Sequence, residues 1–139
     1  MERSLELEEL TRKLYEAVSQ ANKEFFKQYL SGDESCVVIG TAPDEWWDNR
    51  DAALQAICAQ METAGNAVLL TEGNLRAYRQ GDVGWVADRP TLKVGGVEVR
   101  CRHTSVFVRE QQWWRIVQHH FSIGVTNEEV FGAEATKLG

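Results

Sequence analysis

Two histidines, His103 and His120, are the side chains of this sequence best suited to acid–base chemistry, because imidazole gains and loses a proton near neutral pH. Both lie in residues 101–122, CRHTSVFVREQQWWRIVQHHFS, whose two apolar arms around a polar tip predict a long β-hairpin. If the hairpin loop holds an even number of residues, one face of the ribbon carries His103, Ser105, Phe107, Trp114, Gln118 and His120. His119 would then point the other way, toward solvent or a dimer contact.

Such a face has an apolar floor with polar groups at one end, as small-molecule pockets do. We therefore expect His120 and His103 as candidate proton carriers and Gln118 as a polar contact of a ligand. The alternative is a structural role, in which each histidine only bonds to a neighbouring polar or backbone group. The hairpin pattern leaves both roles open.

Carboxylates provide a second set of candidates. Asp88 ends a predicted strand and is a candidate base, although a rim salt bridge to Arg89 or Arg102 is a simpler account. Three further acids surround a tryptophan pair: Asp44, Glu45 and Asp48. A carboxyl group held against indole can serve as an acid catalyst, but these acids are also placed to cap the following helix.

Five tryptophans in 139 residues indicate an aromatic core or an aromatic-lined cavity. We expect five aromatic residues to form the cavity walls: Trp46, Trp47, Trp85, Phe107 and Trp114. Tyr15, on the first predicted helix, is a further candidate ligand contact, because a buried tyrosine hydroxyl needs a polar partner. Plain core packing is the alternative for each of these side chains.

Composition limits the classes of function. The length suits a single domain over residues 1–139, with its core at 5–124 and a tail at 125–139. The net charge of −6 argues against nucleic acid, and no apolar run is long enough to span a membrane. Three well-separated cysteines suggest free thiols in a reducing cytoplasm. No metal or cofactor is expected, since the histidines lack a third ligand nearby and the adjacent His119 and His120 diverge on a strand.

Apolar periodicity predicts the order of the elements. The segments are a helix over 4–30, a strand over 35–40, a helix over 50–62, strands over 68–79 and 83–88, and the two hairpin arms. The first helix has a possible break near Lys23, and the capping pattern from Thr126 to Glu129 predicts a helical turn in the tail. This order predicts an α+β fold, with helices on one face of a curved antiparallel sheet.

Four stretches of the chain resemble the SnoaL-like domains of the nuclear transport factor 2-like superfamily: the long first helix, GTAPDEWWDNRDAALQAI, GDVGWVAD and RHTSVFVREQQWWRIVQHHFS. The resemblance covers about residues 5–124. It implies a cone-shaped, cystatin-like fold, with N-terminal helices packed on a strongly curved antiparallel sheet and a cavity between them. It also implies a homodimer made through the convex face of the sheet, and the two-sided apolar pattern of the hairpin agrees with that.

The superfamily contains isomerases, cyclases, dehydratases, epoxide hydrolases and non-catalytic binding modules, so the fold does not fix the function. Ketosteroid isomerases of this fold carry a catalytic aspartate at the end of the first strand, which corresponds here to Thr41 or Gly40. Neither residue can take a proton from carbon. Tyr15 lies about where those isomerases have their oxyanion tyrosine, so only one of the two isomerase groups is present.

Three functions remain open at this point. The first is a domain that binds a small, largely apolar molecule. The second is an enzyme that uses the same cavity for isomerisation, dehydration or hydrolysis, with His120 or Asp88 as proton carrier. The third is a dimerisation module whose interior is filled.

Overall fold

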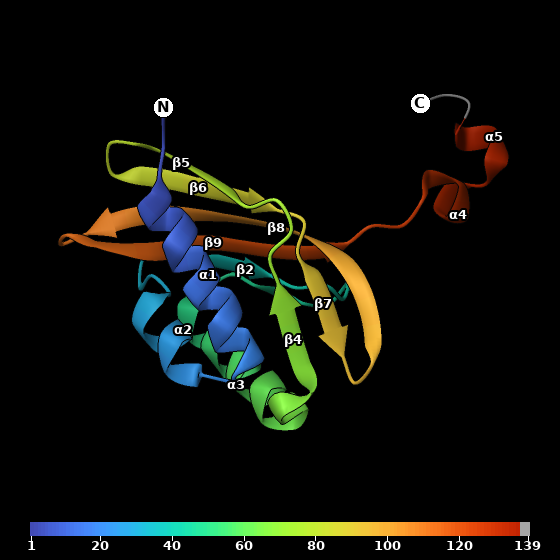
Figure 1. Cartoon of the computed structure of the whole chain (residues 1–139), viewed down its shortest axis with the longest axis horizontal. Coiled ribbons are helices and arrows are strands. Elements are labelled where there is room, and N and C mark those ends of the chain that lie inside the picture. Colours follow the sequence, from blue (N-terminus) through green and yellow to red (C-terminus); the bar gives the residue numbers. More distant parts are fainter. Residues whose placement is uncertain (137–139) are drawn as a thin grey trace.

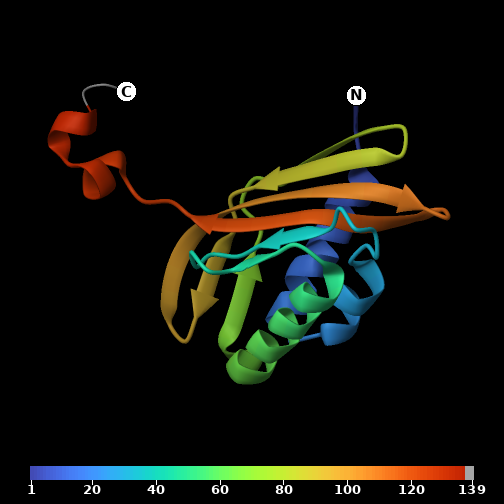
Figure 2. The same cartoon turned by 180° about the vertical axis from the view of Figure 1, so that it is seen from behind.

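The computed structural model describes residues 1–136, and three helices cover one face of a large, strongly bent sheet (Figure 1). These helices are α1 (Leu5–Ser19), α2 (Lys23–Tyr29) and α3 (Arg50–Ala64), followed by a 3-10 turn, Gly65–Ala67. Two short helices, α4 (Asn127–Phe131) and α5 (Ala133–Thr136), lie away from this body in both views (Figures 1 and 2). The predicted α+β class is confirmed.

Side-chain caps set where the first two helices begin. The Ser4 hydroxyl accepts a hydrogen bond from the Leu7 amide at 3.1 Å, and the Asn22 side chain accepts one from the Glu24 amide. Between them Ala21 adopts a φ of 53°, which a right-handed helix does not allow. The predicted break in the long first helix is therefore confirmed, and it divides the segment into α1 and α2.

The nine strands form a mixed sheet. They are β1 (Glu2–Arg3), β2 (Val37–Ile39), β3 (Trp46–Trp47), β4 (Val68–Thr71), β5 (Arg76–Gln80), β6 (Val83–Asp88), β7 (Thr91–Val94), β8 (Val97–Glu110) and β9 (Trp113–Ile123). Seven strands follow the order β1-β5-β6-β8-β9-β2-β3, and β7 joins β8 to β4. The sheet is mixed rather than wholly antiparallel because β2 pairs with β9 in parallel.

Several details of the strands differ from the sequence prediction, which did not include the short strands β1 and β3. The expected strand over 68–79 is two strands, β4 and β5, which pair with different partners. Strand β7, which the sequence did not predict, pairs with the first half of β8. Together β4, β7 and that half of β8 bend toward the helices and close one end of the body (Figure 1).

The hairpin of β8 and β9 has a loop of two residues, Gln111 and Gln112, which meets the condition of an even loop, but it also has an unpredicted β-bulge. Near the tip Phe107 pairs with Ile116, whereas the next pair along is Val106 with Gln118, so Val117 has no partner across the strands. Because side chains alternate along a strand, one extra residue exchanges the two faces of β9 beyond that point.

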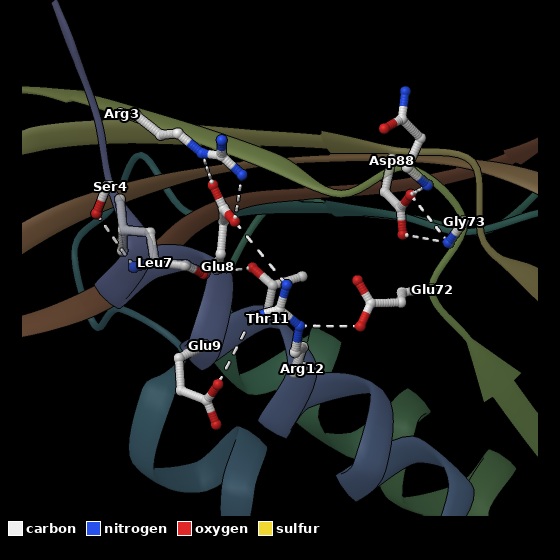
Figure 3. Close-up of polar contacts among 11 residues, drawn as sticks. Arg3, Ser4, Leu7, Glu8, Glu9, Thr11, Arg12, Glu72, Gly73 and Asp88 are labelled. Atoms are coloured by element: carbon white, nitrogen blue, oxygen red, sulfur yellow. Dashed lines mark hydrogen bonds and ion pairs between the residues drawn. The ribbon is translucent and has the colours of Figure 1, made fainter.

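A buried carboxylate ties α1 to the first strand of the sheet. Glu8 is 2% exposed and accepts hydrogen bonds from Arg3 at 2.8 and 3.1 Å. Arg12 lies on its other side at 3.9 Å and also bonds to Glu72 at 2.9 Å (Figure 3). The pKa of Glu8 is lowered, first by the hydrogen bond from Arg3, so this carboxyl group stays ionised near neutral pH.

The hydrophobic core lies between the three helices and the sheet. It contains Leu7, Leu14, Phe26, Val38, Val86, Phe107 and Ile116, among others. A search over residues 1–136 finds no helix that is both long and apolar enough to cross a membrane.

Candidate functional site

An apolar cavity of about 230 Å³ lies between the helices and the bent half of the sheet. Its wall draws on every layer around it: Val18 from α1, Phe26 from α2, Ile57 and Met61 from α3, Trp47 from β3, Leu70 from β4, Leu92 from β7, and His119 and Phe121 from β9. The polar side chains on this wall are Thr41, Glu45, Gln60 and His119. The cavity is thus mainly apolar and has a few polar groups on its wall, as small-molecule binding sites do.

The β-bulge decides which histidine reaches this cavity. His119 pairs with Ser105, and Phe121 pairs with His103, so all four side chains lie on the face that carries the helices. The predicted orientation of His119 was therefore wrong. His119 is 7% exposed and lines the cavity.

Gln118 and His120 lie on the opposite, outer face of the sheet, because they pair with Val106 and Thr104. The sequence prediction that they face the cavity was wrong for the same reason: it assumed an unbroken alternation along β9. Neither side chain lines the cavity, and His120 cannot act as a proton carrier inside it.

The predicted aromatic wall is only partly realised. Trp47 lines the cavity. Phe107 and Trp114 are buried in the core outside it, with Trp114 stacked against Arg109 at 4.7 Å from the ring centre. Trp46 and Trp85 are 62% and 37% exposed and belong to the outer face.

A chain of buried polar side chains runs from the cavity wall through the core. His119 Nδ1 lies 2.9 Å from the Ser105 hydroxyl, and the same hydroxyl lies 2.8 Å from His103 Nε2. His103 Nδ1 lies 2.8 Å from the Tyr15 hydroxyl, which donates to Asp88 Oδ2 at 2.8 Å. We call these five residues the relay. It joins α1, β6, β8 and β9, and the sequence separations within it reach 88 residues.

Asp88 fixes the direction of every hydrogen bond in the relay. Its carboxylate accepts backbone amides from Gly73, Asn74 (2.6 Å) and Arg89 (2.7 Å), as well as the Tyr15 hydroxyl. Figure 3 shows Gly73 beside this carboxylate. An ionised carboxylate only accepts, so the Tyr15 proton must point to Asp88. The salt bridge to Arg89 or Arg102 that the sequence suggested is not formed.

The remaining protons then follow one after another. Because the Tyr15 hydroxyl donates to Asp88, it accepts from His103 Nδ1–H. His103 Nε2 is then an acceptor and takes the Ser105 proton, and the Ser105 oxygen accepts from His119 Nδ1–H. This leaves His119 Nε2 with a free lone pair, and no hydrogen bond within residues 1–136 reaches that atom. The relay therefore leaves His119, a residue of the cavity wall, with one ring nitrogen free to accept a hydrogen bond.

Burial keeps Tyr15, His103 and His119 uncharged. Desolvation lowers the pKa of His119 to about 4, with a smaller effect of His120, so the ring is neutral at pH 7 and its Nε2 can accept a hydrogen bond. The pKa of His103 lies well below its ordinary value of 6.5, again mainly through desolvation. The pKa of Tyr15 is raised by burial and then by the Asp88 charge, so its hydroxyl remains protonated.

A second polar group lies on the cavity wall. Glu45 accepts a hydrogen bond from the Ala42 amide at 2.7 Å and another from Gln60. Its side chain fills the space beside Gly40, where an added Cβ would lie 2.9 Å from the carboxylate oxygen. Glu45 therefore places a carboxylate beside Gly40 and Thr41 on the cavity wall.

Sequence reasoning missed His119 as a cavity residue; Ser105 was placed on the expected ligand face but not chosen as a site residue, and Glu45 was considered as an acid with helix capping as the alternative. Phe121 was the available signal: with His119 it makes an inward pair that fits the apolar cavity, whereas Gln118 is a poor core residue. The part of the chain covered by the structure holds no group of three or more His, Cys, Asp or Glu residues suited to a metal ion.

Residues 7–126 match the SnoaL-like domain family. A search of curated proteins finds no significant match. Solved structures share the fold at low identity. A protein of unknown function from Pseudomonas putida KT2440, described as NTF2-like, has a TM-score of 0.78 and 15% identity over 89% of this chain and 88% of its own.

Two further neighbours carry names that suggest chemistry. A putative dehydratase from Streptomyces avermitilis has a TM-score of 0.71 and 20% identity, covering 84% of this chain and 92% of its own. A putative ketosteroid isomerase from Shewanella frigidimarina NCIMB 400 has a TM-score of 0.69 and 11% identity, covering 82% and 92%. At these identities the neighbours establish the nuclear transport factor 2-like, cystatin-like fold and nothing finer.

Proposed function

Because this chain belongs to the SnoaL-like domain family and encloses an apolar cavity, we propose that it binds a small, largely apolar molecule between its helices and its sheet. The observation that carries the proposal is the mainly apolar wall of this cavity, on which His119 keeps one ring nitrogen without a partner in the described residues. Such a site favours a ligand with an apolar body and one hydrogen-bond donor.

The volume limits the size of the ligand. An apolar cavity of roughly 150 Å³ holds benzene in a well-studied engineered protein. The cavity here is about 230 Å³ and is therefore suited to a one- or two-ring molecule rather than a steroid. This size argues for a smaller substrate than the isomerase neighbour's name implies.

Thermal unfolding in the presence of a ligand panel tests the binding proposal. Indole, naphthalene and 1-naphthol should raise Tm of the wild type, since a ligand that binds only the folded state stabilises it by about 2.7 kcal/mol at a hundred times Kd. Ala64→Phe fills the cavity from α3 and should abolish the shift. Ala59→Phe, on the exposed side of the same helix, is the matched control and should keep it. No shift with any small apolar ligand, or an equal shift in both variants, would count against the proposal.

A second candidate function is acid–base catalysis in the same cavity, with His119 Nε2 as the base. The relay favours it, because the Asp88 carboxylate holds His119 in the tautomer whose free lone pair faces the ligand. Among the predicted catalytic residues, His103 and Asp88 would be positioning residues behind His119.

Nitrogen NMR of the His119 ring tests this second candidate without a known substrate. At pH 7 the relay requires a protonated Nδ1 and an unprotonated Nε2. In addition, 1-naphthol should bind about threefold to tenfold more tightly than naphthalene, as expected for one added hydrogen bond. That preference should vanish in His119→Phe and persist in His120→Phe. A protonated Nε2 at pH 7 would exclude the proposed base.

We also propose that the chain forms a homodimer through the outer face of its sheet. That face exposes Val83 (50%) and Trp85 (37%), and Trp46 extends it at the edge. Large apolar side chains exposed on one face of a sheet favour an interface there. Trp85→Glu should convert the dimer to a monomer in light scattering, whereas Leu69→Glu, which removes an exposed leucine from β4, should not. A cytoplasmic location likewise stays a proposal, which fractionation of the producing cells would test.

A further inference from the structure

A second hollow, of about 560 Å³, lies at the opposite end of the relay from the cavity. It is lined by Gly73, Asn74, Arg76, Ala87, Asp88, Arg89, Arg100, Arg102, His103 and Thr104. Unlike the first cavity it is strongly polar, and it contains four arginines. It does not share a lining residue with the apolar cavity.

These arginines differ from the others in the molecule. The chain has ten, and six of them form an ion pair with a carboxylate: Arg3, Arg12, Arg50, Arg79, Arg109 and Arg115. The remaining four are the four that line the hollow, and within residues 1–136 none of them has a carboxylate partner. In a chain of net charge −6, the unpaired arginines are thus gathered in one place.

The strand pairing explains why a hollow forms among them. Arg76 pairs with Ala87, and Ala87 pairs with Thr104, so these three residues form a row across the outer face of β5, β6 and β8. The small side chains of Ala87 and Thr104 therefore leave space beside the long side chain of Arg76. Arg102 and Arg100 follow Thr104 along the same face of β8, because side chains two apart share a face.

The hollow contains one carboxylate, and its charge is already satisfied. Asp88 is 7% exposed and accepts three backbone amides and the Tyr15 hydroxyl. It therefore does not pair with any of the four arginines. The guanidinium of Arg102 makes one neutral contact, to the Ser122 hydroxyl at 3.2 Å. Most of the donor groups on these four side chains remain available.

We propose that this hollow binds the oxyanion group, phosphate or carboxylate, of a small molecule. Arginine presents paired N–H donors that match the geometry of both groups, and several arginines around a concave site bind them far better than dispersed surface charges do. The acidic remainder of the surface disfavours a nucleic acid, whose backbone needs an extended basic track. This site is distinct from the apolar cavity and does not depend on its function; it shares the outer face of β6 with Trp85, so the proposed homodimer must leave this end of the strands open.

Calorimetric titration at low ionic strength, about 20 mM, tests the proposal, because salt screens interactions of this kind. Pyrophosphate and citrate distinguish the two sources of the oxyanion. At least one should bind with measurable heat, whereas sodium chloride at equal ionic strength should give none. The ligand should also shift the amide NMR signals of Asn74 and Thr104 and leave that of Trp47 in place.

Charge-neutral variants locate the binding. Arg76→Gln/Arg102→Gln should weaken the better ligand at least tenfold, and Arg89→Gln/Arg100→Gln should do the same if the four side chains act together. Lys13→Gln/Lys93→Gln removes two exposed positive charges outside the hollow and is the matched control, which should retain wild-type affinity. All six side chains are exposed, so the variants should fold, as circular dichroism would verify. Absence of binding by both ligands, or equal loss in the control, would overturn the proposal.

Discussion

Replacing Tyr15 by phenylalanine removes one oxygen atom from the middle of the relay. That hydroxyl donates to the Asp88 carboxylate at 2.8 Å and accepts from His103 Nδ1 at 2.8 Å, and all three residues are buried. Loss of a hydrogen bond to a charged group costs roughly 1.5–3 kcal/mol, and a buried donor left unpaired costs roughly 1–3 kcal/mol. Asp88 still accepts hydrogen bonds from three backbone amides in the variant, so the cost of losing its bond to Tyr15 lies near the lower limit of the first range. We expect Tyr15→Phe to lower the free energy of unfolding by about 3 kcal/mol.

Urea unfolding measures this effect. With an m-value of about 2 kcal/mol/M, the midpoint should fall by about 1.5 M. Tyr29→Phe is the matched control: Tyr29 is half-buried against Phe25, and its hydroxyl makes no hydrogen bond in the part of the chain that the structure describes. That variant should change the stability by less than about 0.5 kcal/mol.

The same variant also tests the direction of the relay. Without the Tyr15 hydroxyl, His103 gains nothing from holding its proton on Nδ1, and its proton should move to Nε2 to bond with Ser105. Ser105 would then donate to His119 Nδ1, and the His119 proton would move to Nε2. Nitrogen NMR should therefore show the opposite His119 tautomer in Tyr15→Phe. If Tyr15→Phe were no less stable than Tyr29→Phe and kept the wild-type tautomer, the relay would not be the directed network inferred above.

Three further predictions concern stability. Between pH 6.5 and pH 4 the unfolded chain protonates His119 whereas the folded chain does not. The contribution of this group to the free energy of unfolding is therefore complete above pH 6.5 and should fall by about 3 kcal/mol across that window. In urea unfolding, the loss of stability from pH 7 to pH 5 should be smaller in His119→Gln than in the wild type. Arg3→Ala removes both hydrogen bonds to buried Glu8 and should lower the free energy of unfolding by about 1–3 kcal/mol at pH 7. This loss should become smaller as acid protonates Glu8. Lys13→Ala, which changes an exposed residue of the helix that carries Glu8, should cost less than about 0.5 kcal/mol. Ser105→Ala leaves two histidine nitrogens without partners and should cost about 2–4 kcal/mol, while Ser35→Ala, at an exposed turn, should be nearly neutral in the same assay.

Local patterns in the sequence predicted most of the fold. The apolar spacing of residues 4–30 predicted the segment that forms α1 and α2, and the alternation of the two arms predicted the hairpin of β8 and β9. The split of residues 68–79 into two strands was missed, since Gly73 and Asn74 bend the chain there to present their amides to Asp88. That bend is a tertiary requirement, and it leaves no periodic signature.

The site was harder to predict, because one unpaired residue changed its composition. Strict alternation placed Gln118 and His120 inward, and the bulge at Val117 exchanged them for His119 and Phe121. Tyr15 and Asp88 were identified as candidates, but their direct bond joins residues 73 positions apart and follows only from the docking of α1 on β6. Periodicity reports which face is apolar and carries no information on such pairs.

The adjacent pair His119–His120 gives the bulge a consequence for how this site can change over evolutionary time. A loss or gain of one residue in β9 ordinarily replaces every inward side chain by its neighbour. Here the neighbour is also an imidazole, so a slipped strand would still offer a ring nitrogen to the interior, although a different one. The adjacent histidines therefore keep an imidazole on the cavity wall even if one residue is inserted into or deleted from this bulged strand.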